Sequence, residues 1–353
     1  MSIGERIKGA RKRANLSLRD LAEKVGVSAQ AISKYERNLD VPGSSALIKL
    51  ARSLEVRVEY LLRPLCISLS QPSYRSYRSK LRVQDEELVN AQVQDWLERY
   101  ISVEEIVNLQ TEFHMPAIDR KVKQLDDIER VALDLREFWQ IGLDPIENLV
   151  EILETQGIKV GVVKGADNFD ALTLMANENI PIIVVKDDVP GDRKRLSIAH
   201  ELGHLILELP EDMDEEKAAY RFAGAFLVPK PSAYRELGEK RQQLDFYELH
   251  LLKHKYGMSM QAWIYRAQDL NILSKPSVAA MYRKFNMNGW KRQEPGDPYP
   301  SERTDRLERL VLRALTEDMI SETRAEELLG MSLADFWMQA SKQHDGLPLP
   351  IHR

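Results

Sequence analysis

The stretch His200-Glu201-Leu202-Gly203-His204 restricts the fold of this 353-residue chain more than any other part of the sequence. It lies in the largely apolar segment 196–207, which predicts a buried helix. On a helix, residues i and i+4 share one face, so two imidazoles at this spacing can hold one metal ion. The glutamate beside the first histidine then points toward a metal-bound water. The pattern predicts Zn2+ ligands at His200 and His204 and a catalytic base at Glu201.

A catalytic zinc site takes a third protein ligand and keeps one position open. The next predicted helix starts at Glu215 and Glu216, and either glutamate can reach back to the metal, while Asp214 is the predicted cap. Small residues follow and allow close helix packing: Ala218, Ala219, Ala223, Gly224 and Ala225. Tyr220, one turn after Glu216, is predicted either to hydrogen-bond a developing oxyanion or to pack.

These groups together predict peptide-bond hydrolysis. Zinc lowers the pKa of its water to about 7. Glu201 is expected to take the proton from this water and to pass it to the leaving amine.

Charge divides the chain into two parts. The first 64 residues hold 13 Lys and Arg against 7 Asp and Glu, a balance of +6 within a total of −5, which leaves −11 for the remainder. A basic head on an acidic body predicts a polyanion-binding domain. The lone cysteine, Cys66, excludes a disulfide framework. No apolar run approaches the roughly 18 residues that span a bilayer, so we expect a cytoplasmic protein without membrane partners.

Residues 3–63 predict five short helices, namely Ile3–Ala14, Leu18–Val25, Ala29–Arg37, Ser45–Leu54 and Val58–Leu62. Ser17 and Asp20 fit a capping box, and Gly26 fits the left-handed residue that ends the second helix. The second and third helices therefore form a helix-turn-helix pattern. The third helix is apolar at Ile32, and its other side is polar and suited to a major groove: Ser28, Gln30, Ser33, Lys34 and Arg37.

This segment resembles the XRE/Cro-type helix-turn-helix family. The resemblance is carried by Leu21-Ala22, Gly26-Val27-Ser28, Gln30, Ile32-Ser33, Tyr35-Glu36 and Pro42. It implies a structural ion pair between Arg11 and Glu36. Asn38 stands where the family usually has glycine, and Arg19 stands where it often has glutamine, so DNA contacts at Arg19 are expected to differ. A homodimer on a double-stranded DNA operator is expected, because one such unit reads a half-site. The alternative is a helical adaptor without groove contacts.

Residues 66–80 predict an extended linker or a strand pair, in which Tyr74–Arg78 either contacts nucleic acid or is solvated. Helices are predicted next at Asp85–Glu98, Val103–Gln110 and Ile128–Gln140, with another at Pro145–Gln156. Three strands follow at 158–163, 170–175 and 180–185. Residues 246–272 and 301–340 are helical by periodicity, and 320–336 predicts a helix-turn-helix-like unit that either binds a partner or packs as an extension.

Residues 126–292 resemble the ImmA/IrrE family of metallopeptidases. The resemblance is carried by Leu135–Trp139, Asp144–Val150, Asp192–His204, Phe222–Pro229 and Gly289-Trp290. It implies that the third ligand is Glu216. Many relatives have a second acid where this chain has Ala218, which makes Glu216 more necessary or the site weaker. The resemblance also implies an exposed strand edge near Asp170–Met175 that holds an extended substrate.

The expected fold is α+β and mostly helical. It comprises a five-helix DNA-binding domain (1–65), a linker with connecting helices (66–125), a zincin-like α+β peptidase domain with a small sheet (126–292) and a helical extension (293–353). The expected function is a DNA-binding transcriptional regulator with a zinc-dependent peptidase that cleaves a regulatory protein such as a repressor. The alternative is a non-catalytic antitoxin or repressor that binds its own operator and neutralises a partner toxin.

Overall fold

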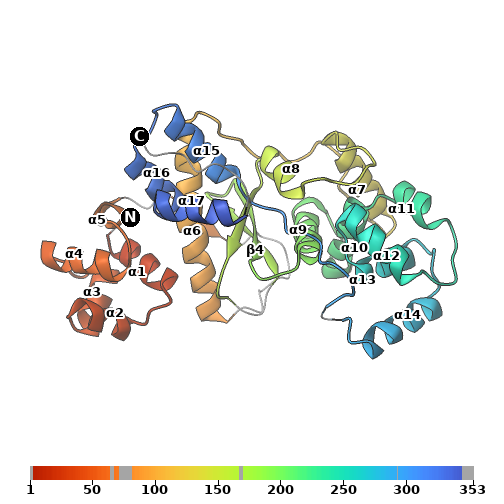
Figure 1. Cartoon of the computed structure of the whole chain (residues 1–353), viewed down its shortest axis with the longest axis horizontal. Helices are drawn as coiled ribbons and strands as arrows, with labels where there is room; N and C mark the ends of the chain where they lie inside the picture. The colour runs from red at the N-terminus through yellow and green to blue at the C-terminus, as the bar shows by residue number, and fades with distance from the viewer. Residues whose placement is uncertain (1–2, 64–66, 71–81, 167–169, 292, 344–353) are drawn as a thin grey trace.

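A computed structural model describes residues 3–63, 67–70, 82–166, 170–291 and 293–343. It is mostly helical with a small mixed sheet, as expected (Figure 1). The N-terminal domain has five helices: α1 (Ile3–Arg13), α2 (Leu18–Val25), α3 (Ala29–Glu36), α4 (Ser44–Ser53) and α5 (Val58–Leu62). Each lies within a residue or two of its predicted bounds. A buried apolar cluster holds them together, formed by Ile7, Leu21, Ile32, Leu50 and Leu61 among others.

Local signals set the turns of this domain. Ser17 and Asp20 form the predicted capping box at the start of α2. Gly26 ends α2 in the left-handed conformation with φ of 77°. Asn38 follows α3 with φ of 56°, a region that asparagine tolerates better than most residues. The predicted helix-turn-helix geometry is therefore confirmed.

A single helix, α6 (Val83–Ile106), replaces the two helices expected at 85–98 and 103–110. The expected break was wrong, because the intervening residues 99–102 contain neither glycine nor proline. The buried face also continues through the gap: Leu97, Tyr100 and Val103 are all buried. The helix therefore runs uninterrupted along the sheet and the C-terminal helices.

The sheet has the order β1-β3-β4-β2, with β1 at Leu69–Ser70, β2 at Lys159–Val163, β3 at Ala171–Ala176 and β4 at Ile180–Lys186. β3 runs antiparallel to β4 and β1, and β2 runs parallel to β4. The three strands predicted from 158 onward are confirmed within one or two residues. Of the linker expected at 66–80, Leu69–Ser70 forms a strand, and Tyr74–Arg78 lies outside the described residues.

Strand alternation gives the sheet two buried faces. Leu172, Leu174 and Val184 pack with α6, whereas Ile183 and Val185 pack with α9 (Gly191–Ile206). In Figure 1 the sheet accordingly lies between α6 and α9. The side chain of Thr173 lies on the α9 side. Helix α9 therefore receives one polar group from an otherwise apolar sheet face.

Helix α10 (Glu215–Leu227) packs closely against α9. A Cβ atom at Gly203 of α9 would lie 3.1 Å from Phe222 Cδ1 and 3.2 Å from the Cα atom of Ala219. The predicted role of small residues at this contact is thus confirmed, since both Gly203 and Ala219 contribute to it. The close contact sets how far the start of α10 lies from the histidines of α9.

Further helices surround this pair: α7 (Asp127–Phe138), α8 (Leu149–Thr155), α11 (Lys230–Leu237), α12 (Phe246–Tyr256), α13 (Met260–Asp269) and α14 (Lys275–Met287). The C-terminal helices are α15 (Arg306–Thr316), α16 (Glu322–Leu329) and α17 (Leu333–Gln343). Leu310, Val311 and Leu328 of α15 and α16 pack against Tyr100 and Val103 of α6. The helix-turn-helix-like unit at the C-terminus is therefore part of a packed extension. None of the helices in the described ranges is long and apolar enough to cross a bilayer.

Ion pairs join the N-terminal domain to the rest of the chain. Arg13 Nη1 lies 2.5 Å from Asp95 Oδ1, and Arg6 and Lys12 pair with Glu98 and Glu87 of α6. At the other end of the contact, Arg63 pairs with Glu327 at 2.6 Å and Arg57 with Glu326 at 3.2 Å. The basic head predicted from the sequence is thus docked on acidic side chains of α6 and α16.

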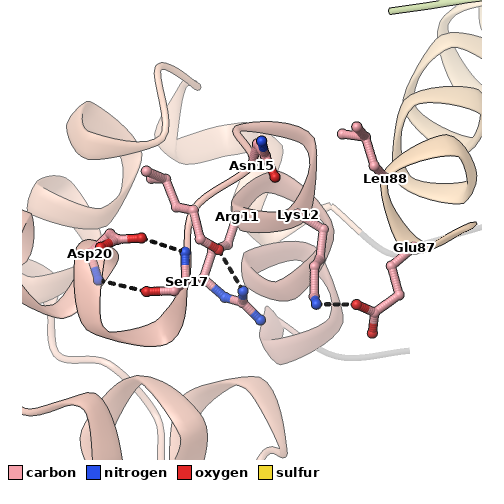
Figure 2. Close-up of a pocket in the computed structure, with 8 residues that line it drawn as sticks. Arg11, Lys12, Asn15, Ser17, Asp20, Glu87 and Leu88 are labelled. Atoms are coloured by element: carbon pink, nitrogen blue, oxygen red, sulfur yellow. Dashed lines mark hydrogen bonds and ion pairs between the residues drawn. The ribbon is translucent and has the colours of Figure 1, made fainter. Parts of the chain in front are cut away.

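A cleft of about 520 Å³ lies at this junction (Figure 2). Its polar groups already have partners within the chain. Lys12 pairs with Glu87, Ser17 and Asp20 cap α2, and Arg11 donates to the carbonyl of Leu16 at 2.7 Å. The cleft is therefore part of the docking contact.

Candidate metal centre and nucleic-acid interface

Helices α9 and α10 bring two histidines and one glutamate together. His200 Nε2 and His204 Nε2 lie 3.0 Å apart. Glu216 Oε1 lies 3.3 Å from His204 Nε2, and Glu216 Oε2 lies 3.5 Å from His200 Nε2. Among the described residues, these three form a group whose ligand atoms all lie within 4.8 Å of one another.

The chemistry of this donor set fits zinc. Two imidazole nitrogens and one carboxylate oxygen are a ligand set of catalytic zinc sites. Nitrogens at about 2.0–2.1 Å from a tetrahedral zinc ion stand about 3.3 Å apart, close to the separation of the two Nε2 atoms. The helical spacing of His200 and His204 places their two Nε2 atoms together. The close packing of α10 on α9 at Gly203 brings Glu216 to them.

Glu201 lies between the α9–α10 pair and the sheet. Its side chain is buried, and Thr173 of β3 donates a hydrogen bond of 2.8 Å from Oγ1 to Glu201 Oε2. Burial raises the pKa of the Glu201 carboxyl, and His204, His200 and the Thr173 hydroxyl act in the opposite direction. Thr173 bonds to Oε2, so Oε1 is the carboxylate oxygen of Glu201 that can contact other groups.

Thr173 was missed from the sequence, although a signal was present. It is the one polar residue in the apolar run Ala171-Leu-Thr-Leu-Met175. A hydroxyl at an inward strand position needs a hydrogen-bond partner. That partner cannot be named without the packing of β3 on α9.

Glu215 lies on the other side of the His204 ring from Glu216. Glu215 Oε1 is 3.2 Å from His204 Nδ1. Asp214 caps α10 by accepting from the Lys217 backbone N–H at 3.0 Å, as expected for that residue. The two consecutive glutamates therefore approach different nitrogens of one imidazole.

Tyr220 lies one turn after Glu216, and its ring centroid is 4.1 Å from that of His200. Its side chain is 57% exposed at the surface beside the site. The structure thus brings together all five residues predicted for this centre, from both helices.

The polar side of α3 faces away from the docking contact. Ser28, Gln30, Lys34 and Arg37 are exposed, and Ser33 is half-buried. The Ser28 hydroxyl caps α3 by accepting from the Ala31 N–H. Arg19 is exposed near the start of α2. In Figure 1, α1 lies toward α6 and α3 lies beyond it.

Arg11 serves the fold of the domain. Its guanidinium donates to both carboxylate oxygens of Glu36, at 2.5 and 2.9 Å, and both side chains are nearly buried. The ion pair implied by the family resemblance is confirmed. It joins α1 to α3 and fixes the angle at which α3 presents its polar side.

Comparison with known proteins gives the same two-part organisation. A helix-turn-helix family model matches residues 7–61, and a model of the IrrE N-terminal-like domain, of the M78 peptidase family, matches residues 154–268. The fold and these matches define a chain with an N-terminal helix-turn-helix domain and an IrrE-like peptidase domain. The chain belongs to the XRE-type helix-turn-helix regulators.

Three relatives illustrate the similarity. The HTH-type transcriptional regulator ImmR of Bacillus subtilis is 37% identical over 62 residues, 18% of this chain and 49% of the relative. SinR of the same species is 46% identical over 61 residues, 17% of this chain and 55% of the relative. The uncharacterized HTH-type transcriptional regulator MT0491 of Mycobacterium tuberculosis is 33% identical over 99 residues, 28% of this chain and 69% of the relative. The match to ImmR thus spans about half of that protein's length.

Proposed function

We propose that the chain binds operator DNA through residues 1–65 and cleaves a regulatory protein at a zinc centre within residues 126–292. His200, His204 and Glu216 are the zinc ligands, and Glu201 is the catalytic base. The convergence of the two Nε2 atoms on the Glu216 carboxylate, next to a buried Glu201, carries this proposal.

Zinc, when bound, supplies a Lewis acid that makes water a nucleophile near neutral pH. Glu201 accepts a proton at Oε1, because Oε2 already accepts the hydrogen bond from Thr173. Glu201 then returns this proton to the leaving amine of the cleaved peptide bond. Tyr220, at the exposed rim beside His200, is the proposed hydrogen-bond donor to the developing oxyanion.

The substrate is a protein segment in extended conformation. Strand β3 is the proposed edge for it, since the pairing of β1 with β3 involves only Met175 and Ala176 among the described residues. Residues Ala171–Leu174 of β3 pair on their other side with β4. An added strand along this stretch would pass the position of Thr173 and thus lie close to Glu201.

Replacement of Glu201 by Gln tests the catalytic part. The Glu201→Gln variant is expected to retain zinc and operator DNA and to lose cleavage of proteins that copurify with the native chain, as read by mass spectrometry. If the Glu201→Gln variant regulates transcription as well as the native chain does, the non-catalytic antitoxin or repressor is favoured instead. Native protein that takes up no zinc would exclude the peptidase.

DNA recognition through α3 has its own test. The polar residues of α3 and Arg19 are the proposed contacts, and a homodimer on two half-sites is the proposed binding form. Gln30→Ala is expected to cost about 1–3 kcal/mol and to relax base preference at one position. Lys34→Ala should weaken binding to all sequences alike and reduce its salt dependence. Equal binding by both variants and the native chain would exclude α3 as the reading helix.

A further inference from the structure

We infer that Glu215 is a positioning residue of the metal centre, which holds the His204 ring with its Nε2 lone pair directed at the metal. The inference rests on the proposed zinc site and adds a residue to it. Its basis is that Glu215 and Glu216 approach opposite nitrogens of the same ring.

The contact with Glu215 favours one tautomer of His204. An ionised carboxylate only accepts hydrogen bonds, so the 3.2 Å contact with Glu215 becomes a hydrogen bond in the tautomer whose Nδ1 donates. A neutral imidazole with its proton on Nδ1 has its lone pair on Nε2. This is the nitrogen that faces His200 and Glu216, and it must be unprotonated in order to bind a metal ion.

The start of α10 determines where the Glu215 carboxylate lies. Glu215 is the first residue of the helix, directly after the Asp214 cap. Its side chain is 21% exposed, against 41% for Glu216. The close α9–α10 contact at Gly203 fixes the distance between Glu215 and His204. Two closely packed helices, α9 and α10, therefore hold the His204 ring and the Glu215 carboxylate in place.

The two histidines differ in the partners of their Nδ1 atoms. Nδ1 of His200 is buried and has no hydrogen-bond partner among the described residues. Glu215 thus provides the carboxylate contact to Nδ1 that His200 lacks. Loss of such an outer partner typically weakens metal affinity by about 10–100-fold.

Zinc titration of the full-length, metal-free chain against a competing chelator tests the inference. Glu215→Ala is expected to bind Zn2+ about 10–100-fold more weakly than the native chain. Glu215→Gln should fall between the two, because an amide oxygen still accepts from Nδ1 but lacks the charge. Asp212→Asn removes a nearby exposed charge and is expected to leave the affinity unchanged. Thermal unfolding of each metal-free variant separates these effects from a loss of fold.

Nitrogen NMR of the metal-free chain gives a second readout. The native chain and Glu215→Gln should show the proton of His204 on Nδ1, and Glu215→Ala should lose this preference. Equal zinc affinity of the native chain and folded Glu215→Ala would overturn the inference. A drop in zinc coordination number in Glu215→Gln, seen by X-ray absorption, would also overturn it, because Glu215 would then be a ligand. Failure of the native chain to bind zinc would instead reject the proposed function itself.

Discussion

Thr173 of β3 donates a hydrogen bond of 2.8 Å to Glu201 of α9, and both side chains are buried. This bond joins the sheet edge proposed for substrate to the proposed catalytic base. A shift of β3 would therefore move the Glu201 carboxylate with it.

Replacement of Thr173 by Val should destabilise the chain by about 1–3 kcal/mol, because a buried carboxylate loses a donor. Thr173→Ser keeps the hydroxyl and should retain more of the stability. Urea unfolding of the metal-free protein measures both. In a Glu201→Gln background the cost of Thr173→Val should shrink, and an unchanged cost would show that the bond does not contribute.

Gly203→Ala should destabilise the chain by about 1–3 kcal/mol, since a Cβ atom would press on Ala219 backbone and Phe222. The same change should weaken zinc binding, because α10 carries Glu216. Gly9→Ala in α1 is the matched control: no atom lies within 4 Å of its added Cβ, so a gain of about 0.5–1 kcal/mol is expected. Urea unfolding and zinc titration would show whether Gly203→Ala instead behaves like this control.

Glu154 predicts a pH dependence of stability. Burial raises the pKa of this carboxyl from 4.5 to about 7, opposed by the hydrogen bond from Tyr100 and by the charges of Arg306 and Lys159. Between these pH values the folded state keeps a proton that the unfolded state releases. Stability should therefore fall as pH rises from 4.5 to 7, by at most about 3 kcal/mol from this group.

The Glu154→Gln variant should lack this fall, so its stability relative to the native chain should increase between pH 5 and pH 8. Glu151→Gln on the same helix is the control, since the Glu151 side chain is 55% exposed. Urea unfolding at the two pH values provides the measurement. An identical pH profile for Glu154→Gln and the native chain would contradict the assigned pKa.

Charge reversal should separate the N-terminal domain from the body. Glu87→Lys, Asp95→Lys and Glu327→Lys together remove three of its partners, each worth about 0.2–1 kcal/mol where exposed. Small-angle scattering should show a larger radius of gyration, and added salt should enlarge the native chain in the same direction. DNA affinity should not fall, because α3 is untouched.

The double reversal Glu105→Lys and Glu322→Lys alters the same helices at exposed positions away from the contact and serves as the control. Reversing Lys12, Arg13 and Arg63 to Glu in the triple variant should restore the compact form. A triple variant as compact as the native chain would mean that apolar contacts hold the domain.

The sequence predicted what depends on local pattern. The capping box at Ser17, the turn at Gly26 and the spacing of His200 and His204 each involve residues within a few positions of one another. The break expected in α6 was wrong, because the buried face of the helix continues through residues 99–102 by way of Tyr100 and on to Val103.

Contacts between distant parts of the chain could not be predicted in this way. The Thr173–Glu201 bond links residues 28 positions apart, and the Arg6–Glu98 pair links residues 92 apart. Whether Glu215 or Glu216 faces the two Nε2 atoms depends on how α10 is rotated against α9. This rotation cannot be read from two adjacent positions in the sequence. Docking of the basic head on α6 also depends on which of many acidic residues share a surface.

The docking of α1 on α6 leaves α3 outward, so the proposed binding of α3 to an operator does not require the body to detach. A peptidase held in this way would meet other proteins bound within its reach on the same DNA at a raised effective concentration. The choice of protein substrate would then depend on the DNA site at which the chain is bound as much as on the peptide sequence that is cut.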